Sequence, residues 1–177
     1  MNEIKFGTDG IRGKAGTHPI DKKSIQRIAQ ALCSILPDNP TILIAKDTRE
    51  SGSWIEDTLS QELRKYGLKI VLCGVLPTAA LACAVVDYPA DLGIVITASH
   101  NPAQDNGIKI FSALGGKLSK SHQIQVQEFL EDPKPLFTSK GQIISHPNPS
   151  YPWKSRLPKI DLSGWRILLD CAHGSLS

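Results

Sequence analysis

The sequence predicts a three-layer α/β/α domain with a mostly parallel, mixed sheet, followed by the opening strand of a second α/β domain. Two observations lead to this fold class. Short runs of Ile, Val and Leu alternate along the chain with longer stretches whose apolar residues recur every three or four positions. The composition, 41% hydrophobic and 21% charged over 177 residues, is that of a folded globular chain. Alternating strands and helices favour a parallel sheet that helices cover on both faces.

Helices and strands follow from the periodicity of the apolar residues. The clearest helix covers residues 24–36, where Asp21 is a candidate N-cap and Pro37 ends the pattern. Further helices are expected at 53–66, 77–86 and 119–130. Strands are expected at 41–45, 69–73, 92–97 and, as a short strand beside the last, 108–111.

The chain divides into two parts of different character. Residues 1–157 are expected to form one domain, whose last part, from Asp132, is a proline-rich connector rather than a core element. Residues 158–177 are expected to open a second α/β domain with a strand at 166–169. Since that strand has no partner in the sequence, its apolar residues and the adjacent Trp165 are expected to promote self-association.

Charge and composition argue against several classes of function. The formal net charge is +3 and the basic residues are scattered, so binding to nucleic acid is not expected. No apolar run reaches membrane-spanning length and the N-terminus lacks a signal core, so we expect a cytoplasmic protein without a membrane partner. The cysteines lie in apolar stretches, which is typical of buried free thiols in a reducing compartment. They are Cys33, Cys73, Cys83 and Cys171.

The loop TASHNPAQDNGIK is the first candidate site. A strand delivers Ser99 to the rim of the sheet, where the carboxyl ends of parallel strands collect functional groups. His100 and Lys109 are candidates for positive charge and proton transfer beside it. The alternative is that Ser99 and Asn101 only satisfy backbone groups of the loop. Because the loop has no G-x-S-x-G elbow and no evident acidic triad partner, phosphoryl transfer fits it better than acyl transfer.

Two further polar clusters could bind an anion. The glycine-rich stretch FGTDGIRG permits close approach of a ligand and carries Arg12, whose planar guanidinium suits phosphate; taken alone, it is equally typical of a flexible N-terminal loop. The loop KDTRESG ends a strand and opens a helix, a position that attracts anions. There Arg49 either binds phosphate or forms a surface ion pair with Asp47 or Glu50. The turn GVLPT is interpreted as a plain connection between a strand and a helix.

Four motifs resemble, in order, the N-terminal domain of the α-D-phosphohexomutases: FGTDGIRG, KDTRxSG, GVLPTA and TASHNPxxDNGIK. The opening FGTDGIRG resembles most closely the phosphoglucosamine mutase branch of that family. In DLSGWRILLDCAHG the chain also resembles the first strand and turn of the family's second domain. The resemblance implies an enzyme that interconverts 6-phospho and 1-phospho sugars, here glucosamine phosphates, through a sugar bisphosphate and with Mg²⁺ as cofactor.

The resemblance also implies roles for individual residues. Ser99 matches the serine that carries the phosphate, and one oxygen of its phosphate or hydroxyl would be a ligand of Mg²⁺. His100 and Lys109 match residues that stabilise charge and transfer protons, and Arg12 matches an active-site arginine near the phosphoserine. The residues expected to contact the phosphosugar substrate or its phosphate are Thr8, Asp9, Gly10, Arg49 and Asn101.

The chain departs from the family pattern in the recognition loops. The family's metal loop, D-G-D-G-D-R, and its sugar- and phosphate-recognition loops do not occur in these 177 residues. Since catalysis depends on positioning, we expect this polypeptide alone, as an N-terminal fragment, to be inactive or nearly so. Two alternatives stay open: a fragment of a phosphomannomutase or phosphoglucomutase, and a non-catalytic binding module derived from the family.

Overall fold

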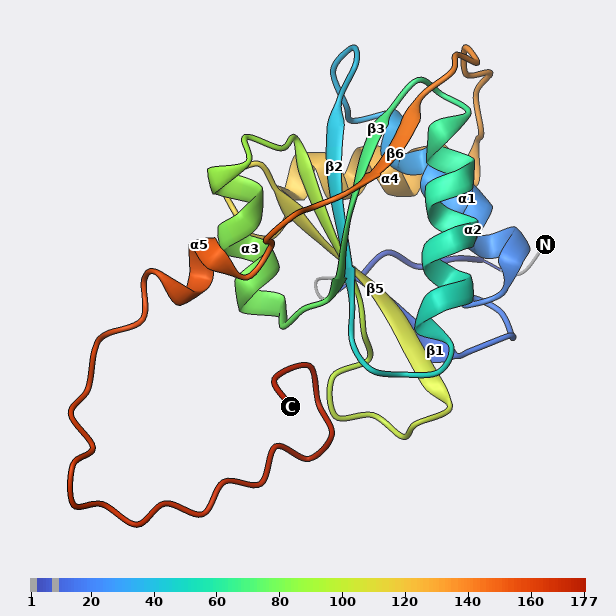
Figure 1. Ribbon diagram of the computed structural model, residues 1–177. Helices are drawn as coiled ribbons and strands as arrows, with labels where there is room; N and C mark the ends of the chain where they lie inside the picture. Colours follow the sequence, from blue (N-terminus) through green and yellow to red (C-terminus); the bar gives the residue numbers. More distant parts are fainter. Residues whose placement is uncertain (1–2, 8–9) are drawn as a thin grey trace.

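A mixed β-sheet organises the chain, whose computed structural model describes residues 3–7 and 10–177 (Figure 1). Within those residues six strands pair in the order β1-β5-β4-β2-β3-β6. β2 pairs in parallel with β3 and β4, β3 pairs in parallel with β6, and β5 is antiparallel to both β1 and β4. The strands are β1 (Ile11–Lys14), β2 (Thr41–Lys46), β3 (Lys69–Val75), β4 (Leu92–Ile96), β5 (Asp105–Ser112) and β6 (Gln142–Ser145).

Helices cover both faces of this sheet. The helices are α1 (Lys22–Cys33), α2 (Gly52–Arg64), α3 (Thr78–Asp87), α4 (Lys120–Glu131) and α5 (Tyr151–Lys154). In Figure 1, α1 and α2 lie to the right of the sheet, and α3 and α5 lie to its left. The predicted three-layer α/β/α architecture with a mostly parallel mixed sheet is therefore confirmed.

Two apolar clusters hold the layers together. The larger cluster packs the buried sides of α1, α2 and α4 against one face of the sheet, with Ile28, Leu59 and Val126 fully buried. The smaller cluster packs α3 against the other face, with Leu81 and Val85 fully buried and Trp153 of α5 at its edge. β4 contributes to both clusters, because its side chains alternate between the faces of the sheet. The strand that leads to Ser99 is thus buried along its whole length.

The proline-rich connector is the main place where the sequence prediction was wrong. Residues 142–145 form β6, which pairs in parallel with β3 at the edge of the sheet, and residues 151–154 form α5 beside α3. Both elements are only four residues long. An apolar repeat cannot be recognised over so short a stretch. An edge strand such as β6 also needs no such repeat, because it forms through backbone hydrogen bonds to one neighbouring strand. β1 also escapes prediction, because it overlaps the end of the glycine-rich motif, whose composition is typical of a loop.

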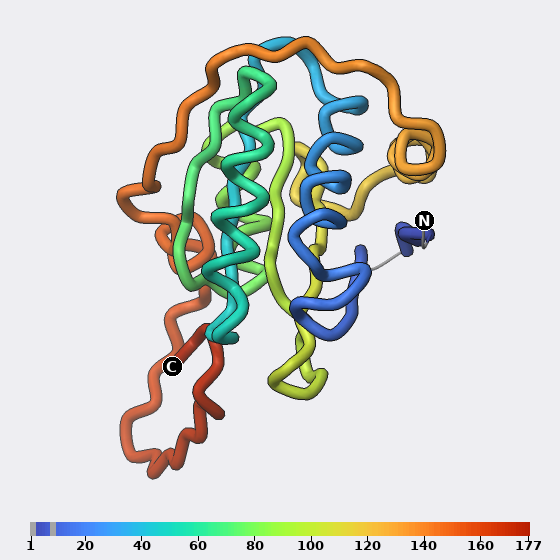
Figure 2. The backbone as a smooth tube through the Cα atoms, turned by 90° about the vertical axis from the view of Figure 1, so that its right-hand side faces the viewer, coloured from blue at the N-terminus to red at the C-terminus, as the bar shows by residue number. Residues whose placement is uncertain are grey.

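The expected strand at 166–169 is not formed. The chain leaves the domain after α5 and makes a wide loop that returns its end toward the sheet (Figures 1 and 2). Along this loop Trp165, Leu168 and Leu169 are 73%, 99% and 78% exposed. A strand needs a neighbour for its backbone N–H and C=O groups, and this segment pairs with none of the described strands.

The cysteines are free, but they are not all buried as expected. Cys73 is buried, Cys33 and Cys83 are half-buried, and Cys171 is exposed in the C-terminal loop. Burial raises the pKa of the Cys33 thiol to about 12, with the Glu62 charge adding to the effect. Burial likewise raises the pKa of Cys73 to about 12. These two thiols are therefore unreactive at neutral pH. No helix in the described part of the chain is long and apolar enough to cross a membrane.

Asp21 caps α1 as the sequence predicts. Its Oδ1 accepts a hydrogen bond from the Ser24 backbone N–H (2.9 Å), and its Oδ2 accepts one from the Ser24 hydroxyl (2.8 Å). Burial raises the pKa of Asp21, but these hydrogen bonds and the charge of His18 outweigh burial and leave the pKa below its ordinary value. The ionised carboxylate thus stabilises the folded state above the unfolded pKa, and this contribution is lost as the pH falls through the lowered folded pKa.

We expect Asp21→Ala to lower the free energy of unfolding by about 1 kcal/mol at neutral pH, because an N-terminal N–H of α1 loses its partner. Chemical denaturation at neutral pH and below the lowered pKa measures the difference. The destabilisation should shrink at acidic pH, where the wild-type carboxylate is protonated. Asp21→Asn is the control, since its amide oxygen also caps but does not titrate. Equal destabilisation by Asp21→Ala at both pH values would contradict the prediction.

Candidate active site

Two loops meet at the carboxyl ends of neighbouring parallel strands. β2 and β4 run side by side, with Lys46 opposite Ile96, and the Asp47 N–H donates to the Ile96 carbonyl (3.0 Å). The chain leaves β2 toward β3 on one side and leaves β4 toward β5 on the other. The two connections therefore diverge here, and such a switch point is where open α/β sheets bind ligands. The Arg49 loop and the Ser99 loop therefore lie side by side at this edge of the sheet.

Ser99 lies on the exposed rim of this switch point. β4 ends at Ile96, Thr97 and Ala98 are buried, and the chain emerges at Ser99 and His100, which are both exposed. The backbone of Ser99 has φ +58°, in the left-handed region that L-residues rarely adopt. The Ser99 Oγ lies 3.5 Å from the His100 Nδ1. The hydroxyl is thus accessible and has a proton acceptor or donor beside it.

Arg49 binds the Ser99 loop with all of its side-chain N–H groups. Its Nε donates to the Asp47 Oδ2 (3.1 Å), and its two terminal nitrogens donate to four backbone carbonyls at 2.6–2.9 Å. The side chain is only 10% exposed. Of the roles expected from the sequence, the structure favours the pair with Asp47, since the guanidinium has five N–H donors and five protein acceptors. The carbonyls belong to Ser99, Asn101, Pro102 and Asp105.

Asp47 and Thr97 complete the support of this loop; the sequence suggested Asp47 only as an ion-pair partner of Arg49, and it did not single out Thr97. The Thr97 hydroxyl donates to the Asp47 Oδ2 (2.6 Å) and accepts the Ser99 N–H (3.0 Å). The Asn101 amide donates to the Asp105 Oδ2 (3.1 Å), so this side chain stays within its own loop. The one feature of the sequence that could have pointed to Asp47 is its position directly after a buried strand.

Arg12 lies in β1, beside the strand that follows the Ser99 loop. It lies opposite Gly107 of β5 in the antiparallel pair, and Thr97 donates its N–H to the Gly107 carbonyl (2.9 Å). A Cβ built on Gly107 would lie 2.9 Å from both the Arg12 Cγ and the Thr97 carbonyl oxygen. The stem of Arg12 therefore crosses Gly107 beside the residue that leads into the Ser99 loop. Its buried Nε has no hydrogen-bond partner among the residues that the structure describes.

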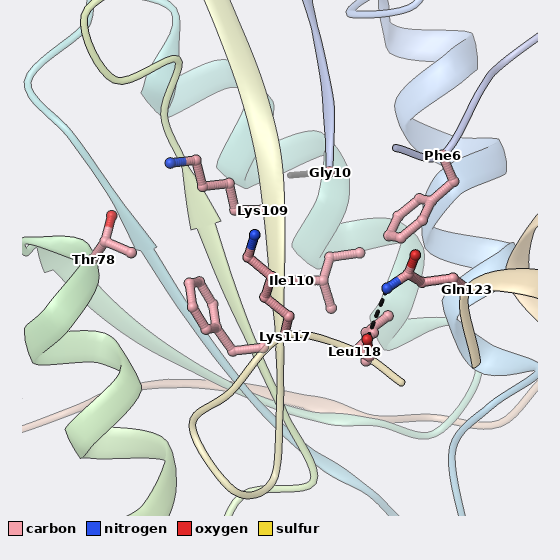
Figure 3. A pocket seen from close by; sticks show the side chains of 9 residues that line it. Phe6, Gly10, Thr78, Lys109, Ile110, Lys117, Leu118 and Gln123 are labelled. Atoms are coloured by element: carbon pink, nitrogen blue, oxygen red, sulfur yellow. Dashed lines mark hydrogen bonds between the residues drawn. The ribbon is translucent and has the colours of Figure 1, made fainter. Parts of the chain in front are cut away.

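Lys109 and Gly10 line a neighbouring pocket of about 240 Å³ rather than the space around Ser99. In Figure 3 the Lys109 side chain extends toward Thr78, across from Phe6. Gly10 has φ +84°, and a Cβ there would lie 2.0 Å from the Ile108 carbonyl oxygen, so only glycine fits this close approach to β5. Thr8 and Asp9, which were also expected in the site, lie outside the described residues.

An open cleft of about 920 Å³ contains Ser99, His100 and Asn101. Thr78, the last residue of the GVLPT turn and the first of α3, lines both this cleft and the Lys109 pocket. No side chain caps the N-terminus of α3, whose partial positive charge lies toward the cleft. The C-terminal loop borders the opposite side, where the Thr48 hydroxyl donates to the His173 carbonyl (2.8 Å).

The described residues do not by themselves fit a Mg²⁺ ion. Among them, no group of three His, Cys, Asp or Glu side chains could hold a metal. The Asp47 carboxylate accepts hydrogen bonds on both oxygens, from the Arg49 backbone and side chain and from Thr97. Mg²⁺ requires an octahedron of oxygen ligands, and the described residues around Ser99 do not supply that set. The expectation that Ser99 is a metal ligand stays a prediction.

The fold and the site define an α/β/α domain that presents an exposed serine on an arginine-braced loop at the switch point of its sheet. The family description "Phosphoglucomutase/phosphomannomutase, alpha/beta/alpha domain I" matches residues 3–135. The chain belongs to this family, which confirms the resemblance inferred from the four motifs. The boundary expected between residues 157 and 158 is not tested by the match and stays a prediction.

Curated relatives and solved structures agree with this assignment. The chain is 36% identical over 99% of its length to a phosphoglucosamine mutase of Janthinobacterium sp. (strain Marseille), and 38% identical over 99% to that of Pseudoalteromonas translucida. It spans 42% and 41% of the length of these relatives. A putative phosphomannomutase from Thermus thermophilus superposes with a TM-score of 0.72 at 29% identity, over 83% of this chain and 34% of that one.

Proposed function

We propose that residues 1–177 form the phosphate-carrying part of a phosphoglucosamine mutase, with Ser99 as the residue that takes up and returns the phosphate. The presentation of Ser99 carries the proposal. Its hydroxyl is exposed at a switch point of the sheet, on a left-handed residue held on both sides by hydrogen bonds. A plain connector needs no such support. The names of the curated relatives support glucosamine phosphate as the substrate.

The proposed reaction moves a phosphoryl group between Ser99 and a phosphosugar. A hydroxyl oxygen of the sugar monophosphate attacks the phosphorus of phosphoserine 99, and the bond from phosphorus to the Ser99 Oγ breaks. The proton of the sugar hydroxyl ends on the Ser99 Oγ, and His100, at 3.5 Å, is placed to relay it. The resulting bisphosphate then reverses its orientation in the site, and the reverse transfer returns its other phosphate to Ser99.

Positive groups around the cleft would stabilise the charge of the transferred group. The uncapped N-terminus of α3 offers backbone N–H groups toward the cleft that contains Ser99. His100 lies next to Ser99, Arg12 crosses β5 beside Thr97, and Lys109 lines the adjoining pocket. When bound, Mg²⁺ would neutralise further phosphate charge, with Ser99 as one ligand and the others supplied from outside these residues.

A chimera tests the proposal, in which residues 1–177 replace the matching N-terminal part of the Pseudoalteromonas translucida relative. We expect it to convert glucosamine 6-phosphate to glucosamine 1-phosphate in a coupled assay with Mg²⁺ and a sugar bisphosphate activator. Residues 1–177 alone are expected to show no turnover in the same assay. A folded chimera that fails with every hexose phosphate would favour the alternative of a non-catalytic binding module.

A second candidate substrate is mannose or glucose phosphate. The solved structures favour it, since one is a putative phosphomannomutase and another, from Burkholderia thailandensis, is a phosphoglucomutase/phosphomannomutase family protein with 25% identity. In the chimera the sugar loop would come from the relative, so this choice requires the gene's complete reading frame. An enzyme from that frame with equal activity on mannose 6-phosphate and glucosamine 6-phosphate would overturn the assignment to glucosamine.

We also propose that the exposed apolar residues of the C-terminal loop promote self-association of residues 1–177. Trp165, Leu168 and Leu169 present large apolar surfaces to water without a packing partner. Size-exclusion chromatography with light scattering should show a mass that rises with concentration, while a chain of residues 1–157 stays monomeric. A monomer at every concentration, with a loop that resists proteolysis, would contradict the proposal.

A further inference from the structure

Ser99 is held in a conformation that it would not adopt unaided. Its φ of +58° places the backbone in the left-handed region, which is unfavourable for a residue with a Cβ. Ser99 and His100 are both exposed, so apolar packing of their side chains does not fix this geometry. The hydrogen bonds of the Ser99 backbone must therefore hold it in place.

Both polar backbone groups of Ser99 are bound by buried side chains of one network. The Ser99 N–H donates to the Thr97 Oγ1 (3.0 Å), and the Ser99 carbonyl accepts from the Arg49 Nη2 (2.8 Å). Asp47 joins these two partners, because its Oδ2 accepts both the Thr97 hydroxyl (2.6 Å) and the Arg49 Nε (3.1 Å). The bonds thus close a ring that starts and ends at Ser99. We call Asp47, Arg49 and Thr97 the serine clamp.

The chemistry of each member of the clamp is specific. The Thr97 hydroxyl gives its proton to Asp47, so its lone pair is directed to the Ser99 N–H. Arg49 spans the loop from the Ser99 carbonyl to the Asp105 carbonyl, which only a planar guanidinium with five donors can do. A lysine ammonium has three donors at a single point and would leave carbonyls of the loop without a partner.

We propose that the serine clamp consists of positioning residues that hold the Ser99 backbone left-handed, so that its Oγ keeps one position as the phosphate arrives and leaves. This inference rests on the proposed function of Ser99 as the phosphate carrier. It assigns Arg49 to the loop rather than to the substrate, because every guanidinium donor already has a protein acceptor. Asp47 acts through Arg49 and Thr97, because both of its carboxylate oxygens accept hydrogen bonds from these two residues.

Amide hydrogen exchange of residues 1–177, followed by NMR, tests the clamp. Thr97→Val keeps the side-chain shape but removes the acceptor of the Ser99 N–H, and Thr97→Ser restores it. We expect the Ser99 amide to exchange about tenfold faster in Thr97→Val, the effect of losing one hydrogen bond, and at the wild-type rate in Thr97→Ser. Arg49→Lys should also accelerate exchange at Ser99. The amides of Leu43 and Ile44 in the sheet report on global stability.

Unchanged Ser99 exchange in both Thr97→Val and Arg49→Lys would overturn the clamp. If Arg49→Lys loosens the whole sheet, the Thr97→Val and Thr97→Ser pair decides alone. Titration with inorganic phosphate separates the two roles of Arg49. If Arg49 belongs to the clamp, the NMR signals of its side-chain N–H groups should not shift as phosphate is added. A saturable shift of those signals would assign Arg49 to anion binding instead. These measurements need no phosphate on Ser99, so they stand whether or not the proposed function does.

Discussion

Replacing Ser99 with alanine is expected to abolish sugar phosphate interconversion by the chimera. The reaction proposed above passes the phosphate through the Ser99 Oγ, and alanine has no atom that could carry it. Loss of a covalent carrier removes a whole step, so we expect a decrease on the order of 10³-fold or more in kcat. Alanine differs from serine by one exposed oxygen, which lies 3.5 Å from the His100 Nδ1, so the fold should tolerate its loss. The coupled assay for glucosamine 1-phosphate measures the effect.

The phosphate itself gives a second measurement of the same prediction. Mass spectrometry of the active chimera should find one phosphate, on the peptide that contains Ser99, and Ser99→Ala should lack it. Ser121→Ala is the matched control, because Ser121 is an exposed serine in α4. Activity that survives Ser99→Ala, or a phosphate that persists on another residue, would refute the proposed mechanism.

The sequence predicts the site's location because that location depends on topology alone. Once β2 and β4 are recognised as buried parallel strands, the loops that follow them must lie at one edge of the sheet. Their neighbourhood could thus be inferred without any knowledge of side-chain contacts. The fold class could be predicted for the same reason, since α1, α2 and the central strands all carry long and regular apolar patterns.

The role of Arg49 could not be predicted, because its acceptors are backbone groups. Any residue type offers a carbonyl, so the sequence contains no sign that Ser99 and Asp105 turn theirs toward Arg49. β6 escaped prediction for a related reason, since an edge strand of four residues is defined by its pairing with β3 rather than by its side chains. The role of Arg49 and the formation of β6 both depend on hydrogen bonds between segments far apart in the sequence.

Gly107→Ala is expected to damage the fold and the site together. A Cβ at this position would lie 2.7 Å from the Ile11 carbonyl oxygen, 2.9 Å from the Arg12 Cγ and 2.9 Å from the Thr97 carbonyl oxygen. Two of these atoms belong to the backbone on either side of Gly107, so they cannot move without opening the sheet. We expect a loss of about 2–3 kcal/mol in the free energy of unfolding, as for overpacking in a core. Thermal and chemical denaturation of residues 1–177 measure this loss.

The strain at position 107 should also reach Ser99, because the new Cβ would press against the carbonyl oxygen of Thr97, which belongs to the serine clamp. Any shift of Thr97 moves the acceptor of the Ser99 N–H, so the chimera should lose more activity than its unfolded fraction explains. Gly116→Ala is the control, since the nearest atom to its Cβ would be the Ser112 Oγ at 4.0 Å. If Gly107→Ala unfolds at the wild-type temperature, this result would contradict the prediction that β1 and Thr97 leave no room for a Cβ at position 107. If instead it is destabilised but the folded fraction retains full activity, the strand end and the Ser99 loop are not coupled.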